Sequence, residues 1–79
     1  MKQERLKLTF PEDLVRQPVI GQMVRKFDVL PNIRRASVEE HMGWMICEIE
    51  GDDTAVERAV QWLIDRGIQV DRLEDIVES

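Results

Sequence analysis

Apolar residues in this chain change their spacing several times, and the order of these changes restricts the possible folds. Leu6, Leu8 and Phe10 alternate with polar residues, which predicts a strand with one buried face that ends at Pro11. After Pro18, whose fixed φ suits the first turn of a helix, the spacing of apolar residues becomes helical. The apolar residues of that helix face are Ile20, Met23, Val24 and Phe27.

Two further extended segments follow this helix. The first begins at Asn32, and its apolar phase shifts near Arg34 and Arg35, which predicts a β-bulge there. A hairpin turn at residues 41–43 leads into a strand over residues 44–50 that ends at Gly51. These two strands are expected to pair in antiparallel fashion.

A second helix and a short strand complete the pattern. Thr54 and Glu57 have the spacing of a capping box, and Gly67 is placed to end the helix. Residues 68–70 then alternate as a fourth strand. The buried stripe expected on this helix consists of Val56, Val60, Leu63 and Ile64.

The resulting order βαββαβ predicts an α+β fold of the ferredoxin-like type. Two crossovers of this kind give a four-stranded antiparallel sheet with both helices on one face. Seventy-nine residues are enough for one such domain, spanning 1–79, with a core over about 6–73 and an acidic tail over 74–79. The other face of the sheet is left open.

Composition excludes several classes of function. With 16 acidic and 11 basic residues the net charge is −5, so the surface repels nucleic acid. No apolar run is long enough to cross a bilayer, so we expect a cytoplasmic protein without membrane insertion. Cys47 is the only cysteine and lies in an apolar run, so it is interpreted as a small buried hydrophobe.

Residues suited to catalysis or metal binding are sparse. The single histidine, His41, is expected in the solvated hairpin turn, and Ser37 has no evident base. Glu48 and Glu50 alternate with apolar residues as part of an acidic strand edge rather than gathering around a cation. The sequence therefore predicts no enzyme, no metal site and no cofactor.

The third strand is apolar on both faces. Trp44 and Ile46 fall on the open face of the predicted sheet, where large apolar side chains favour an interface with another protein. We therefore expect them to form the interface of a homodimer. The alternative is that Ile76 and Val77 of the tail cover them.

The chain resembles the NIL domain family, a ligand-binding module found at the C-terminus of bacterial methionine-importer ATPases. The resemblance covers roughly residues 6–73 and includes no phosphate-binding loop of an ATPase. The segments that carry it are Leu8-Thr9-Phe10, Pro18-Val19-Ile20, Arg25-Lys26-Phe27-Asp28-Val29, Asn32-Ile33, Gly43, Glu48-Ile49-Glu50-Gly51, residues 56–63 and Gly67-Ile68-Gln69-Val70.

The triplet that names this family is Asn-Ile-Leu, and it corresponds here to Asn32, Ile33 and Arg34. The resemblance implies that paired domains bind methionine near their mutual interface, with the asparagine taking part. Independently, an asparagine side chain can meet both the carboxylate and the ammonium group of an amino acid. The alternative is that Asn32 only bonds the backbone of its own turn.

Two functions are consistent with these observations. The first is a homodimeric regulatory module that binds an amino acid, methionine or a related sulfur compound, with Asn32, Ile33 and Arg34 as binding residues. The second is an adaptor that binds a protein partner in trans without any ligand, which the arginine at position 34 favours.

Overall fold

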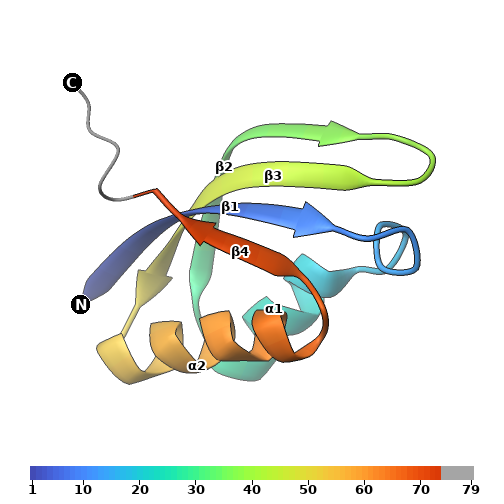
Figure 1. Ribbon diagram of the computed structural model, residues 1–79. Helices are drawn as coiled ribbons and strands as arrows, with labels where there is room; N and C mark the ends of the chain where they lie inside the picture. The colour runs from blue at the N-terminus through green and yellow to red at the C-terminus, as the bar shows by residue number, and fades with distance from the viewer. Residues whose placement is uncertain (74–79) are drawn as a thin grey trace.

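The computed structural model describes residues 1–73 of the chain, which form four strands and two helices (Figure 1). The elements are β1 (Lys2–Phe10), α1 (Val19–Phe27), β2 (Leu30–Val38), β3 (Gly43–Gly51), α2 (Asp53–Asp65) and β4 (Gln69–Arg72). The expected tail at residues 74–79 lies outside the described residues.

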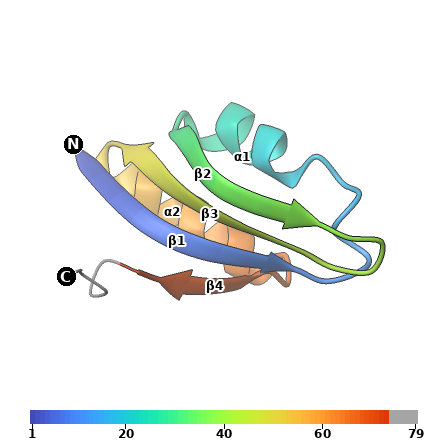
Figure 2. The ribbon, with the colours of Figure 1, turned by 90° about the horizontal axis from the view of Figure 1, so that it is seen from above.

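The four strands form one sheet in the order β2-β3-β1-β4, and every neighbouring pair is antiparallel. Both helices lie on the same side of this sheet (Figure 1). Seen from above, α2 passes behind the middle of the sheet whereas α1 lies toward β2 (Figure 2). The predicted ferredoxin-like βαββαβ fold is therefore confirmed, and β2 occupies one edge of the sheet.

β1 starts four residues earlier than the apolar alternation indicates. Lys2 pairs with Gly51 and Arg5 with Glu48, so the polar beginning of β1 continues the ladder with β3. Glu4 lies on the helix side and is only 7% exposed, because Arg72 pairs with its carboxylate. This polar segment forms a strand because β3 pairs with its backbone and Arg72 pairs with Glu4. The spacing of apolar residues cannot reveal such partners.

The predicted bulge in β2 is confirmed. Asn32 is opposite Glu48 and Ile33 opposite Cys47, whereas Arg35 is already opposite Ile46. The extra residue is Arg34, so the side chains before and after it change their phase relative to β3. As a result, Asn32 and Arg35 both lie on the open face of the sheet.

The core lies between the sheet and the two helices. Its largest fully buried side chains are those of Leu6, Leu8, Met23, Ile49 and Leu63. Cys47 is also fully buried, on the central strand β3. Burial, together with the nearby negative charge of Glu48, raises the pKa of its thiol to about 11.

Two expectations for the second helix are wrong. The N-cap is Asp52, which makes no side-chain capping bond, so the capping box of Thr54 and Glu57 does not form. Ile64 is 44% exposed because Ala59 occupies the buried face in its place. The end of the helix is as expected.

Gly67 ends α2 in the conformation that favours glycine. Its φ is +100°, a backbone angle that residues with a side chain rarely adopt. The next residue, Ile68, donates its N–H to the carbonyl of Leu63 at 3.1 Å, a Schellman-type closure that satisfies the helix end. Ile68 is buried just before β4 begins.

Candidate functional site

The face of the sheet that the helices leave open carries one row of polar residues from three strands. The register places Glu48 of β3 between Asn32 of β2 and Arg5 of β1. Residues directly opposite in an antiparallel ladder share a face, so these three side chains meet across the sheet. The row joins the asparagine predicted to bind ligand to two partners from distant parts of the chain.

Glu48 is the centre of this row. Its carboxylate accepts hydrogen bonds from Arg5, at 3.2 Å from Nε and 3.0 Å from Nη2, and from Asn32 Nδ2 at 3.5 Å. Arg34 Nη1 lies 3.6 Å from Oε1 of Glu48 and forms a second ion pair with it. These contacts explain how a charged side chain that is only 8% exposed stays ionised in the sheet.

The pKa of Glu48 is lowered from its ordinary value of 4.5 by these neighbours. The hydrogen bonds from Arg5 are the largest cause, and the bond from Asn32 and the charges of Arg34 and Arg5 act in the same direction. Burial opposes them by raising the pKa. Near neutral pH the Glu48 carboxylate is therefore negatively charged, and the positively charged Arg5 and Arg34 lie beside it.

The polar row still has groups that face solvent. The side chains of Arg5 and Arg34 are 49% and 53% exposed. A guanidinium has five N–H donors, and those that do not contact Glu48 are available to an anion. Asn32 is exposed and its amide oxygen remains an acceptor.

Trp44 and Ile46 lie on this same face, as predicted, but each is only partly exposed. The register places Lys7 opposite Ile46, and its ammonium lies 5.5 Å from the centre of the Trp44 ring. Lys7 is thus one step along β1 from the polar row, next to the apolar residues of β3. No observation tests whether Trp44 and Ile46 form a dimer interface, which stays a prediction.

The three residues of the predicted triplet site do not converge. Asn32 and Arg34 meet at Glu48, but Ile33 lies opposite Cys47 on the helix side of the sheet, where it is 53% exposed. Sequence reasoning missed Arg5, because its place opposite Glu48 depends on the register of β1 against β3.

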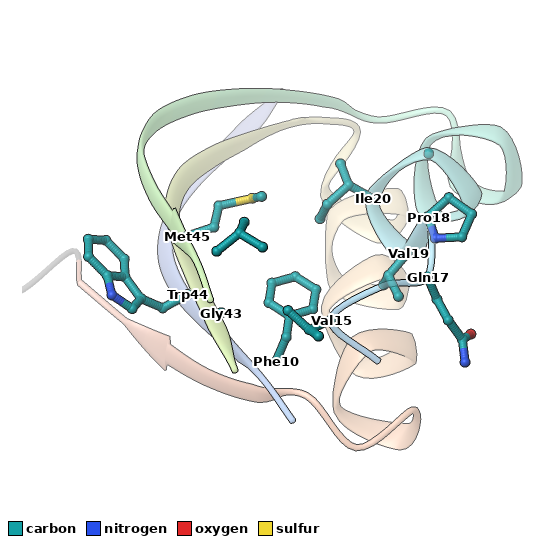
Figure 3. A pocket seen from close by; sticks show the side chains of 11 residues that line it. Phe10, Val15, Gln17, Pro18, Val19, Ile20, Gly43, Trp44 and Met45 are labelled. Carbon is teal, nitrogen blue, oxygen red and sulfur yellow. The ribbon is translucent and has the colours of Figure 1, made fainter. Parts of the chain in front are cut away.

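A separate groove of about 170 Å³ lies on the helix side, at the far end of the sheet from Asn32. The side chains that point into it are those of Phe10, Val15, Ile20 and Met45 (Figure 3). Trp44 also lines the groove, but its ring points away toward the open face of the sheet. No residue of the predicted triplet lines this groove. It depends on how the loop after β1 packs against β3, so no local sequence pattern indicates it.

The remaining candidate groups are dispersed over the surface. The side chain of His41 is 72% exposed at the tip of the β2–β3 hairpin, where its Nδ1 lies 2.8 Å from Oε2 of Glu12. Over residues 1–73, no three His, Cys, Asp or Glu side chains gather closely enough to hold a metal ion. Within that same range, no helix combines the length and apolar character that crossing a membrane requires.

The family model of the NIL domain matches residues 4–72. The chain belongs to the NIL domain family. The match includes β1 from Glu4 onward, the other three strands, both helices and the polar row around Glu48. Asn32, Ile33 and Arg34 all lie within the matched residues.

Curated relatives of this NIL domain include proteins named for methionine import. The methionine import ATP-binding protein MetN 2 of Acinetobacter baylyi is 31% identical over 70 residues, which cover 84% of this chain and 20% of that protein. The corresponding MetN protein of Helicobacter pylori is 26% identical over 77 residues, covering 92% of this chain and 24% of the relative. The chain thus spans about a quarter or less of these relatives.

A solved structure has the same fold as this NIL domain. The C-terminal domain of an ABC transporter ATP-binding protein from Enterococcus faecalis superposes with a TM-score of 0.79. The alignment covers 91% of this chain and 84% of that one at 14% sequence identity. At this identity the likeness concerns the fold alone.

Proposed function

We propose that this NIL domain is a non-catalytic regulatory module of the cytoplasm that binds a free amino acid and acts as a homodimer. Methionine or a related sulfur compound is the first candidate ligand. The observation that carries the proposal is the row of Asn32, Glu48 and Arg5 on the open face of the sheet, with Arg34 beside it. A response to the ligand would be passed on through a protein partner in trans.

The charges of this row complement those of an amino acid. The exposed donors of Arg5 and Arg34 suit the ligand's carboxylate, because guanidinium groups bind carboxylates through paired hydrogen bonds. The amide oxygen of Asn32 suits the ammonium group. Glu48 fixes the positions of all three by holding the donors that point inward.

An apolar surface for a ligand side chain lies next to the row. Ile46 precedes Glu48 by two residues on β3, so it occupies the same face one step along the strand, and Trp44 follows in the same direction. Both are partly exposed. A thioether chain bound by the polar row could rest on these two residues.

The names of the relatives support methionine as the first ligand to test. Proteins that share this domain are called methionine import ATP-binding proteins, and an amino acid of that kind has the polar and apolar parts that the open face would contact. The ATPase function of those longer proteins is not part of the proposal, since the matched region is only about a quarter or less of their length.

Isothermal titration with methionine and a panel of sulfur amino acids tests the proposal. We expect heat of binding from at least one of them, and at least about tenfold weaker binding by Asn32→Ala, because a hydrogen bond to a charged group contributes about 1.5–3 kcal/mol. Gln61→Ala, on the exposed side of α2, is the matched control and should bind as the native chain does. Absence of heat with every ligand would refute the amino-acid assignment.

A further inference from the structure

The charges of α2 are divided between two sides of the helix. Glu57 lies on the side next to β1, where its carboxylate is 3.2 Å from Nζ of Lys2. Arg58, Trp62 and Arg66 follow one another at intervals of four residues, so they form one stripe, the α2 stripe, along the side next to α1. The acidic side therefore has a partner within the chain, whereas the α2 stripe combines two cations with an aromatic ring.

Trp62 is the centre of the α2 stripe and is held by an aromatic and a cationic contact. Its ring meets that of Phe27 on α1 edge to face, with the ring centres 5.8 Å apart. The guanidinium of Arg66 lies 5.0 Å from the centre of the Trp62 ring, and its Nη2 donates to Oε1 of Gln17 at 3.2 Å. The indole is partly exposed, and its N–H finds no side-chain or backbone acceptor among residues 1–73. This donor is therefore available to an acceptor from outside the chain.

Several cations of the helix layer lack an acidic partner. Within the part of the chain that the structure describes, the helix residues without an ion pair include Arg25, Lys26, Arg58 and Arg66. Lys26 and Arg58 are both exposed and line a depression of about 500 Å³ between the end of α1 and the beginning of α2. The whole chain has a net charge of −5, so these cations form a local positive region on a negative molecule. Such a region attracts an anionic partner.

Acidic side chains border this positive region without entering the α2 stripe. Asp52 and Asp53 line the depression at the beginning of α2, and Asp53 lies 3.8 Å from the amino terminus of the chain. Asp65 accepts a hydrogen bond from Gln61 at 3.0 Å. An acidic partner is therefore attracted along the α2 stripe and repelled from the beginning of the helix, which gives the contact a direction.

We infer that the α2 stripe docks an acidic amphipathic helix of another protein. An extended segment needs a sheet edge to satisfy its backbone, whereas a helix satisfies its own and can lie along α2. Carboxylates of the partner contact Arg58 and Arg66, and an apolar residue between them rests on Trp62. This inference rests on the partner in trans of the proposed function, to which it assigns a surface and a chemistry.

The spacing of the α2 stripe determines the spacing that the partner requires. Arg58 and Arg66 are eight residues apart, which is about 12 Å along a helix axis. A partner helix parallel to α2 therefore needs its acidic residues at positions i and i+8 and its apolar residue at i+4. Any other spacing leaves one arginine or the tryptophan without a contact.

Two synthetic helical peptides of equal length test the inference. One carries glutamate, leucine and glutamate at i, i+4 and i+8 on an alanine-rich background, and in the other lysine replaces both glutamates. Binding is followed by the fluorescence of Trp62 in the full chain with Trp44→Phe, where Trp62 is the only tryptophan. We expect saturable binding of the acidic peptide below about 1 mM, and binding of the lysine peptide about tenfold weaker or more.

Charge reversal in the same chain locates the contact. Arg58→Glu should weaken binding of the acidic peptide about tenfold or more, because it replaces an attraction by a repulsion. The double variant R58E/R66E should prefer the lysine peptide. Arg35→Glu, exposed on β2 in the sheet layer, changes the net charge equally and should bind as the parent chain does. Circular dichroism checks that each variant is folded, and the exposed position of Arg58 keeps the test valid even if the double variant does not fold.

Three results would overturn the inference. One is the absence of saturable binding of the acidic peptide up to millimolar concentration. Another is an equal loss of affinity in Arg58→Glu and Arg35→Glu, which would show attraction by net charge without a defined surface. The third is binding, detected by isothermal titration, that leaves the fluorescence of Trp62 unchanged, which would place the peptide elsewhere on the molecule.

The peptide result is separable from the ligand assignment. Titration of methionine into the native chain measures binding to the polar row, which contains neither Arg58 nor Trp62. Heat of methionine binding without a response to the peptide would refute the α2 stripe alone. A peptide response with the expected charge dependence but no heat from methionine would refute the ligand alone.

Discussion

Arg5 and Glu48 stand directly opposite each other on β1 and β3, and two nitrogens of the Arg5 guanidinium contact one carboxylate oxygen of Glu48 at 3.2 and 3.0 Å. This pair fixes a charge in the middle of the open face without help from the helices. It also positions Asn32, whose amide donates to the same carboxylate. Side-chain hydrogen bonds thus join the polar residues of three strands at this point of the sheet.

The first prediction concerns the pH dependence of this pair. The folded-state pKa of Glu48 lies below its unfolded value, so the stability it contributes is complete above 4.5 and is lost as the pH falls through the folded pKa. Arg5→Ala removes the largest cause and should raise the pKa of Glu48, as measured by carboxyl carbon NMR titration. Lys7→Ala, which leaves the contacts of Glu48 intact, is the control, and an equal rise there would contradict the assignment.

The second prediction compares adjacent residues of α2. Leu63 is fully buried, so Leu63→Ala should lower the free energy of unfolding by about 2–5 kcal/mol through lost contacts and a residual cavity. Ile64 is 44% exposed, and Ile64→Ala should cost about 1 kcal/mol or less. Urea denaturation followed by tryptophan fluorescence measures both. Equal losses would mean that the buried face of α2 is wrongly assigned.

The third prediction compares two glycines that line the groove of Figure 3. A methyl group at Gly21 meets no atom within 4 Å, so Gly21→Ala should stabilise the chain by about 0.5–1 kcal/mol through its higher helix propensity. A methyl group at Gly43 would lie 2.9 Å from Cγ2 of Val15 and 3.3 Å from the carbonyl oxygen of Ser37.

Gly43→Ala should therefore lower the stability by about 1–3 kcal/mol, the usual cost of overpacking. Thermal denaturation of both variants gives the comparison. A midpoint for Gly43→Ala at or above that of the native chain would show that the loop after β1 yields to the added methyl group.

The fourth prediction concerns the end of α1. Asp28 has φ 57° and ψ 50°, the left-handed conformation, and its N–H donates to the carbonyl of Val24 at 3.1 Å. Asp28→Asn keeps a side chain suited to this conformation and removes a negative charge from the negative end of the helix dipole, so it should stabilise by about 0.3–1 kcal/mol.

Asp28→Val places a β-branched residue in the same conformation and should destabilise by about 1–2 kcal/mol. The difference between the two variants in chemical denaturation is the measured quantity. A stable Asp28→Val variant would contradict the left-handed backbone assigned to this position.

Much of the fold could be predicted because local chemistry and spacing determine it. Leu6, Leu8 and Phe10 have the period of a strand, and all three are buried against the helices. The phase shift at Arg34 revealed the bulge, and Gly67 revealed the end of α2. In each case the signal lies within a few residues of the feature it predicts.

The polar row could be predicted only in part because its members are far apart in the sequence. Asn32 was found through the family triplet, but Arg5 lies 43 residues from Glu48, and only the register of β1 against β3 brings the two together. Ile64 was misplaced for a related reason. The helical period allows either Ala59 or Ile64 beside Val60, and the packing of α2 on the sheet selects Ala59.

Burial of Cys47 makes its thiol a natural probe of the transient opening of this protein. The thiol lies on the central strand β3 with no exposed surface, and its pKa of about 11 keeps it protonated near neutral pH. A thiol reagent can therefore react only after the sheet or its helices separate, and only in proportion to the time the chain spends open. Because this is the single cysteine, the labelling rate reports the fraction of time that the protein is open, without any introduced probe.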